Sequence, residues 1–393
     1  MSEPMTYDFL SPRQIVFGWG RRHEVGTLAR TLGRRAFVVC GLPSGAAAVV
    51  QEIAETLRSE GVEAVLVETI THEPEVADVD RAAAELRQRH IADGDFLLAV
   101  GGGAAIDLAK AVAAMAVHDE SPTIRDYLEG VGRGLKLARD PLPVLAMPTT
   151  AGTGAEATKN AVISSYDPPF KKSLRDGRLM PRIALLDPEL CVSVSPMVTA
   201  ASGMDAITQL IESYISRKAR PIPRALAVQG LKLAVPAIAE AVEDGTSRDA
   251  REMMSHAALL SGMALANSGL GMAHGVAPAL GTNCRVPHGV ACALMLPTAL
   301  RVNAGVRREE LATLARLLFE CGPSTPPEEA VETLIERIEQ LCDRVGVPRR
   351  LGEVGVKREQ IPALVRDSRG SSMSGNPREL TDQELTQLLE ELL

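Results

Sequence analysis

The chain has 393 residues, of which 46% are hydrophobic and 23% are charged. Single hydrophobic cores stop growing near about 250–300 residues, so this length predicts two packed domains and excludes a disulfide-stapled miniprotein or a disordered chain. With 50 acidic against 42 basic residues the net charge is −8, which argues against nucleic acid or an anionic membrane as a partner.

The N-terminal residues do not resemble a secretion signal. Residues 1–5 contain an acid and no apolar stretch, and no apolar run further along approaches the roughly 18 residues that span a bilayer. The six cysteines form no C-x-x-C pair, which predicts free and mostly buried thiols. We therefore expect a cytoplasmic protein.

The first half of the chain alternates strand patterns with helix patterns. Strands are expected at residues 36–40, 64–67, 96–100 and 143–147, and helices at residues 46–59, 76–90 and 104–117. This alternation predicts an α/β domain in which a parallel sheet is covered by helices on both faces.

After residue 188 the pattern becomes helical. Apolar residues recur at three- and four-residue spacing over residues 200–216, 224–240, 249–266 and 328–345. The glycine- and serine-rich residues 370–375 predict a mobile loop. We place the boundary near residue 192, which gives an α/β dinucleotide-binding domain over residues 1–192 and an all-helical domain over residues 193–393.

Three consecutive glycines, Gly101, Gly102 and Gly103, follow the strand that ends at Val100 and open the next helix. Their backbone amides can approach a diphosphate closely, and a helix N-terminus adds donors and the positive end of the helix dipole. The motif is not G-x-G-x-x-G, so a tight turn between strand and helix explains it equally well when it is taken alone.

A threonine- and glycine-rich loop, residues 148–156, follows another apolar strand at the same edge of the predicted sheet. Ligands of open α/β sheets lie beyond that edge, and the hydroxyls of Thr149, Thr150 and Thr153 offer donors and acceptors to a ribose or a nicotinamide amide. A capped turn uses the same residue types.

Four residues of the helical half form a candidate metal site. Asp205 and Gln209 are four apart in a helix pattern and therefore share a face, and His274 and His288 each precede a glycine in an apolar stretch. Either histidine alone also fits a hydrogen-bonded core residue. One carboxylate and two imidazoles suit a divalent metal with open coordination positions, so Asp205, His274 and His288 together predict a catalytic metal centre.

These motifs together resemble the iron-containing alcohol dehydrogenase family, which is similar in fold to glycerol dehydrogenase and dehydroquinate synthase. The resemblance spans nearly the whole chain and includes residues 185–190, 203–206 and 376–378. It implies a dinucleotide-binding α/β domain, a helical domain and an active site in the cleft between them. It also implies a homodimer that exchanges hydride between a nicotinamide cofactor and an alcohol or aldehyde.

The resemblance matches Asp205, His274 and His288 to three metal ligands and places Gln209 where typical members have a fourth, histidine ligand. Glutamine offers only a neutral amide oxygen, so the affinity for the metal should fall, or the preference between Fe(II) and Zn(II) should change. Pro278 stands where many relatives have a histidine that relays protons, so proton transfer must use water or another group.

The resemblance also implies cofactor contacts. It matches the three glycines to the pyrophosphate, the three threonines to the nicotinamide side, and Thr158 and Lys171 to further contacts, with Lys172 replacing Lys171 if the register shifts by one. NAD-preferring members commonly have an acidic residue where this chain has Gly41. No carboxylate there repels a 2′-phosphate, and Ser44 can donate to one, which favours NADP(H) over NAD(H).

The leading hypothesis is metal-assisted, reversible reduction of an aldehyde or ketone by NADPH. The weak ligand Gln209 leaves open a metal-independent enzyme of the maleylacetate reductase kind, for which Arg285 is the cation nearest the motifs. A redox-neutral lyase like dehydroquinate synthase, or a nucleotide-binding protein without catalysis, are further alternatives. The physiological substrate is not identified by the sequence.

Overall fold

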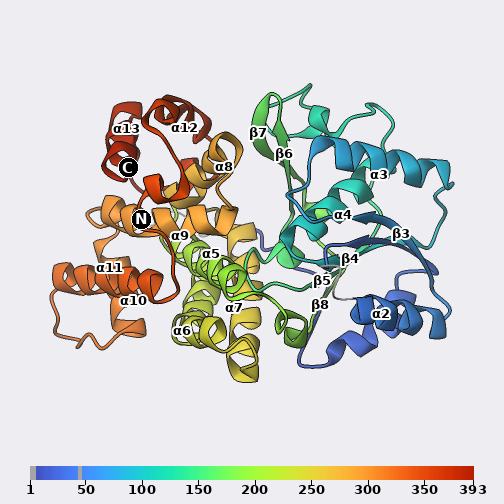
Figure 1. Ribbon diagram of the computed structural model, residues 1–393, viewed down its shortest axis with the longest axis horizontal. Coiled ribbons are helices and arrows are strands. Elements are labelled where there is room, and N and C mark those ends of the chain that lie inside the picture. The colour runs from blue at the N-terminus through green and yellow to red at the C-terminus, as the bar shows by residue number, and fades with distance from the viewer. Residues whose placement is uncertain (1–5, 43–46) are drawn as a thin grey trace. The chain divides into compact units, whose positions relative to one another are not determined.

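The computed structural model describes residues 6–42 and 47–393, so Ser44 lies outside the described residues. The chain forms two compact units, one over residues 12–194 and the other over residues 6–11 and 195–393 (Figure 1). Each unit is described below on its own.

The first unit contains, within the described residues, a six-stranded parallel sheet in the order β1–β8–β5–β4–β2–β3. Its strands are β1 (Gln14–Phe17), β2 (Arg35–Cys40), β3 (Glu63–Thr69), β4 (Asp95–Gly101), β5 (Val144–Pro148) and β8 (Ile183–Leu186). A separate antiparallel hairpin joins β6 (Asn160–Tyr166) to β7 (Pro169–Arg175). The parallel sheet confirms the α/β fold expected from the sequence.

Alternate residues of β4 enter two different hydrophobic cores. Leu97 and Ala99 pack with α3 and α4, whereas Leu98 and Val100 pack with α1 and α2. Figure 1 shows α3 and α4 on one side of the sheet and α2 on the other. Because both faces are covered, β4 is buried throughout and reads as a continuous apolar run. The helices are α1 (Val25–Arg30), α2 (Ala47–Ser59), α3 (Val76–Gln88) and α4 (Gly103–Met115).

The second unit is helical among the residues described. Its helices are α5 (Pro196–Ile215), α6 (Pro221–Glu243), α7 (Arg248–Ser268), α8 (Met272–Cys284), α9 (His288–Asn303), α10 (Arg308–Leu318), α11 (Pro327–Arg344), α12 (Ile361–Asp367) and α13 (Asp382–Glu391). The central helix α5 packs against α6, α7 and α9, while α8 packs against α9 and α12. As a result α5 is buried continuously from Gly203 to Ile215.

Two details differ from the expectations. Of the helices in the described chain, α6 is long and apolar enough to cross a membrane by length and composition alone, contrary to the expectation that no segment is. Because α6 packs against both α5 and α7, we interpret it as a core helix. Residues 370–375, predicted as a mobile loop, contain a 3-10 turn over Met373–Gly375, in which Met373 and Gly375 are buried.

Candidate functional site

Three polar residues occupy one face of the buried helix α5. Asp205, Gln209 and Glu212 follow one another at spacings of four and three residues, and each is at most 2% exposed. Buried polar groups are costly unless they find partners, so the surroundings of this face decide what it does.

Glu212 connects α5 to the start of α8. Its Oε1 accepts a hydrogen bond from the backbone N–H of Ala273 at 2.7 Å, and its Oε2 lies 2.8 Å from Nδ1 of His274. The N-cap residue Gly271 has no side chain to cap α8, so the Glu212 carboxylate satisfies this helix terminus and complements its dipole. A Cβ at Gly271 would lie 2.8 Å from Glu212 Oε1, which explains the glycine.

The C-terminal segment secures the same helix start. Asn376 Oδ1 accepts a hydrogen bond from the Met272 backbone N–H at 3.0 Å, and also one from the Asn303 side-chain amide at 2.9 Å. Asn376 is 1% exposed. The Asn-Pro-Arg segment noted in the sequence therefore supports the helix that carries His274.

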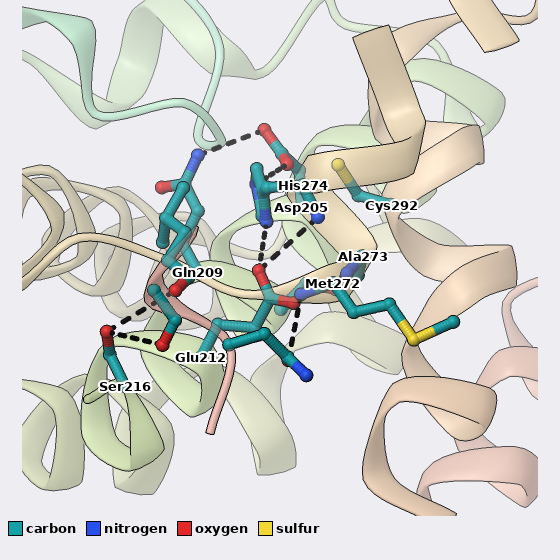
Figure 2. Close-up of polar contacts among 12 residues, drawn as sticks. Asp205, Gln209, Glu212, Ser216, Met272, Ala273, His274 and Cys292 are labelled. Carbon is teal, nitrogen blue, oxygen red and sulfur yellow. Dashed lines mark hydrogen bonds and ion pairs between the residues drawn. The ribbon is translucent and has the colours of Figure 1, made fainter. Parts of the chain in front are cut away.

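Four potential metal ligands converge here from three helices. The ligand atoms of Asp205 on α5, His274 on α8, and His288 and Cys292 on α9 all lie within 4.8 Å of one another. His274 Nε2 is 3.1 Å from Asp205 Oδ1, and His288 Nε2 is 3.9 Å from the same oxygen. Figure 2 shows His274 and Cys292 directed toward Asp205.

The glycine that follows each histidine allows this convergence. A Cβ at Gly289 would lie 2.3 Å from the carbonyl oxygen of Ala201 on α5, so α9 approaches α5 this closely only with glycine there. A Cβ at Gly275 would lie 3.0 Å from Cβ of Met373. The His-Gly pairs that singled out His274 and His288 in the sequence thus have a packing cause.

Gln209 lies beside the cluster with its amide nitrogen toward Asp205. Its Nε2 donates to Asp205 Oδ2 at 3.3 Å (Figure 2). Its Oε1 accepts a hydrogen bond from the Ser261 hydroxyl at 2.8 Å. The Ser261 hydroxyl also lies 2.7 Å from the carbonyl oxygen of Ala258. In this arrangement Gln209 orients the Asp205 carboxylate.

The residues of the cluster and their burial shift one another's pKa values. Burial raises the pKa of Asp205, but the neighbouring His274 and His288 overcome this effect and hold it below the ordinary value. Burial lowers the pKa of His274, but its contacts with Cys292, Asp205 and Glu212 hold that pKa well above its usual range. Burial raises the pKa of the Cys292 thiol to about 12. The cluster therefore keeps an ionised carboxylate and favours a positive charge beside it.

The predicted cofactor loops meet at the carboxyl edge of the sheet. The strand order reverses between β2 and β4, because β2 leads to β3 on one side and β4 leads to β5 on the other. Open α/β sheets bind ligands at such a point. Gly41 follows β2 and donates its N–H to the Val100 carbonyl at 2.7 Å. Gly101 is the last residue of β4, and Gly102 separates β4 from α4.

The glycine loop and the threonine loop are in contact. The Thr149 N–H donates to the Gly101 carbonyl at 3.0 Å. A Cβ at Gly102 would lie 3.1 Å from Thr150 Oγ1, and one at Gly103 would lie 2.6 Å from Thr153 Oγ1. The structure thus brings both predicted loops together at one place.

Thr158 and Lys171 already have protein partners. The Thr158 hydroxyl accepts a hydrogen bond from the buried Lys110 at 2.9 Å, and Lys171 pairs with Glu73 at 2.6 Å. A cofactor contact at either position competes with these partners. Lys172, the alternative to Lys171, is the next residue of β7 and pairs in register with Ile163.

Sequence reasoning missed one member of the metal group, Cys292, and the residue that supports His274, Glu212. Glu212 continues the Asp205–Gln209 face by three more residues, and Cys292 follows His288 by four, so helix periodicity was the available indication for both. Neither spacing shows that α8 starts at Met272, next to Glu212, or that α9 packs closely against α5.

Comparison with known proteins identifies the family. Residues 12–188 match the family of iron-containing alcohol dehydrogenases, and residues 199–393 match the C-terminal domain of the same family. The chain belongs to the iron-containing alcohol dehydrogenases. It is therefore an oxidoreductase of alcohols, and its family uses NAD(P) and a divalent metal.

Individual members of the family are similar over their whole length. The chain is 31% identical to the NAD-dependent methanol dehydrogenase of Bacillus methanolicus over 99% of this chain and 100% of the relative. It is 31% identical to the NADPH-dependent butanol dehydrogenase of Clostridium saccharobutylicum, over 97% of each chain. The solved structure of a 1,3-propanediol oxidoreductase superposes with a TM-score of 0.92 at 30% identity, over 99% of this chain and 100% of that one.

The residues of this iron-containing alcohol dehydrogenase fit a divalent metal. One carboxylate, two imidazoles and one thiol, drawn from three helices to within 4.8 Å and all buried except the half-buried His288, offer the oxygen, nitrogen and sulfur donors that such ions take in proteins. The hydrogen bond from Nδ1 of His274 to Glu212 leaves Nε2 directed at the cluster, as in carboxylate–histidine–metal arrangements.

Proposed function

We propose that this protein is a metal-assisted, NADP(H)-preferring dehydrogenase that reversibly interconverts an alcohol and an aldehyde or ketone. The observation that carries the proposal is the convergence of the buried Asp205 and His274 and the half-buried His288, from three different helices, on one point. A structural role for either histidine alone does not require the other two residues nearby.

Asp205, His274 and His288 hold the cation in this proposal. When bound there, a divalent ion would supply a Lewis acid for the carbonyl oxygen of the substrate, and a nicotinamide cofactor would supply the hydride. Glu212 keeps the proton of His274 on Nδ1, so that Nε2 presents its lone pair. Pro278 carries no ionisable group, so the substrate proton is exchanged through water or another group.

The preference for NADP(H) rests on Gly41 at the end of β2. A carboxylate at this position would repel a 2′-phosphate, and Gly41 has no side chain. The relatives include both an NAD-dependent methanol dehydrogenase and an NADPH-dependent butanol dehydrogenase, so the family itself does not decide the cofactor. Ser44, which would donate to the phosphate, lies outside the described residues.

His274→Ala tests the proposed function. We expect the variant to lose most bound metal and most turnover on a panel of alcohols and aldehydes, while its far-ultraviolet circular dichroism stays that of the parent. Treatment of the parent with EDTA should abolish turnover, and added Zn(II) or Fe(II) should restore it. Unchanged metal content and turnover in His274→Ala, or full activity of the metal-free protein, would overturn the proposal.

The cytoplasmic location, the homodimer and a domain boundary near residue 192 remain part of the proposal. So do the contacts of Gly101, Gly102 and Gly103 with the pyrophosphate and of the threonine loop with the nicotinamide side. The support for these cofactor contacts is that both loops lie together at the carboxyl edge of the sheet.

A further inference from the structure

We infer that the fourth ligand of the proposed metal site is the thiolate of Cys292, and that the site prefers Zn(II) to Fe(II). The inference rests on the proposed function, because it concerns the same site. It replaces Gln209, the fourth ligand expected from the sequence, with a residue on a different helix.

Three of the six distances among the four ligand atoms lie close to those of a tetrahedral site, and all six are within 4.8 Å. Zinc–ligand bonds of about 2.0–2.3 Å place tetrahedral ligand atoms about 3.3–3.6 Å apart. His274 Nε2 and Asp205 Oδ1 are 3.1 Å apart, His288 Nε2 and Asp205 Oδ1 are 3.9 Å apart, and Cys292 Sγ and His288 Nε2 are 3.7 Å apart. Shifts of a few tenths of an ångström along these edges convert the group into a coordination shell.

The fold directs Cys292 into this group. His288 and Cys292 lie at i and i+4 on the first turns of α9, so their side chains share one face of the helix. Cys292 is fully buried. In Figure 2 its sulfur atom lies beside the Asp205 carboxylate and the His274 ring. A thiol placed among a carboxylate and two imidazoles has the surroundings of a metal ligand rather than those of an apolar core residue.

Gln209 is already committed to other groups. The atom that faces Asp205 is Nε2, an N–H donor that cannot bind a cation, and Oε1 accepts from Ser261. A neutral amide oxygen is also a weaker ligand than a thiolate for zinc. Gln209 therefore acts as a positioning residue for Asp205.

The donor set determines the metal. A soft thiolate with two imidazoles favours zinc, whereas an oxygen donor in its place suits harder ions. When the sulfur–metal bond forms, the thiol proton passes to the buffer, so the site releases a proton on loading. Zinc also accepts five ligands, so four protein ligands do not by themselves exclude a substrate.

Cobalt(II) titration of the full-length, metal-free protein tests the inference. We expect a thiolate-to-cobalt charge-transfer band in the near ultraviolet, saturating at one ion per chain. Cys292→Ser should lose this band while retaining the visible ligand-field bands of bound cobalt. Its affinity for Zn(II), measured by competition with a chelator, should fall by at least the roughly 10–100-fold typical of losing a supporting residue, and its affinity for Fe(II) should fall less.

Matched variants separate the possible causes. Cys342→Ser removes another buried helical thiol, on α11, and should leave both the band and the zinc affinity unchanged. Gln209→Ala should keep the charge-transfer band. Cys292→Ala provides a second replacement if the serine variant does not fold. Absence of the band from the cobalt-loaded parent protein overturns the thiolate ligand without either variant.

The outcomes distinguish this inference from the proposed function. Cobalt bound without a charge-transfer band, or a band that persists in Cys292→Ser, overturns the thiolate ligand and leaves the metal-assisted dehydrogenase intact. A parent protein that binds no divalent ion and is active without one overturns both.

Discussion

Glu212 holds His274 from the side opposite Asp205, with Oε2 of the carboxylate 2.8 Å from Nδ1 of the imidazole. The two carboxylates therefore contact both nitrogens of one ring, since Nε2 is 3.1 Å from Asp205. The orientation of the ring and the position of its proton both follow from this pair of contacts.

Replacing Glu212 by glutamine should weaken metal binding without removing a ligand. Glutamine keeps the size of the side chain but loses the charge that fixes the Nδ1 proton and complements the start of α8. We expect the affinity for Zn(II) to fall by about 10–100-fold, measured by chelator competition. Glu243→Gln, which changes an exposed glutamate paired with Arg344, should leave the affinity unchanged. Equal affinity in the two variants would contradict the role of Glu212.

Gly103→Ala should weaken NADPH binding through Thr153. The new Cβ would lie 2.6 Å from Thr153 Oγ1, so the threonine loop must move. We expect the dissociation constant of NADPH, measured by its fluorescence, to rise by about tenfold or more, because a Cβ atom in a packed protein does not come this close to another atom without a shift of one of them. In a Thr153→Ala background the same substitution should have little further effect, because the clashing oxygen is gone. An additive pair of losses would assign the effect to Gly103 itself.

Gly41→Asp should shift the cofactor preference toward NADH. The carboxylate repels the 2′-phosphate and accepts from a ribose hydroxyl, so the ratio of kcat/KM for NADPH over NADH should fall by about tenfold or more. A Cβ at this position would lie 2.9 Å from Cβ of Ala105, so the substitution is best made together with Ala105→Gly. Ala105→Gly alone is the control. A parent protein that already prefers NADH would refute the preference proposed from Gly41.

Glu156 should make the stability of the fold depend on pH. This residue is buried in the threonine loop, and burial raises its pKa to about 7 despite the nearby Lys110. Between about pH 4.5 and 7 the folded state therefore binds more protons than the unfolded state, and the free energy of unfolding falls as the pH rises. Above pH 7 the cost reaches at most about 3 kcal/mol.

Glu156→Gln should remove this dependence. The free energy of unfolding, measured with a denaturant at pH 5 and pH 8, should fall with pH in the parent but not in the variant. The difference between the variant and the parent should therefore be larger at pH 8. The exposed Glu359, changed to glutamine, serves as the control and should not alter the slope. A difference between parent and Glu156→Gln that is the same at both pH values would show that the carboxyl does not titrate in this range.

The sequence predicted the strands and helices whose burial produces a regular pattern of apolar residues. The strands β2, β4 and β5 were predicted from apolar runs, which occur because helices cover both faces of the sheet. The long helices α5, α6 and α7 were predicted from the three- and four-residue spacing of their apolar residues. The strand β1 was missed because it has four residues at the sheet edge, half of them exposed. Helices α8 and α9 were missed because Pro278 and Pro297 lie inside them.

The candidate site was predictable only where chemistry and spacing coincided. Asp205, His274 and His288 stood out as ligand types in apolar surroundings, and the structure brings them together. Cys292, which belongs to the same cluster, and Glu212, which contacts His274, have the sequence context of ordinary helix residues. Their role depends on where α8 starts and on how closely α9 crosses α5, and both are tertiary properties.

The hydrogen bond between Asn376 and the first residue of α8 makes the end of the polypeptide a requirement for the ion site. A nonsense mutation after codon 292 and before codon 376 would leave every proposed ligand translated, yet the helix bearing His274 would lose one of its anchors. Screens that judge truncated alleles by which ligand codons survive would therefore misclassify them as competent for metal.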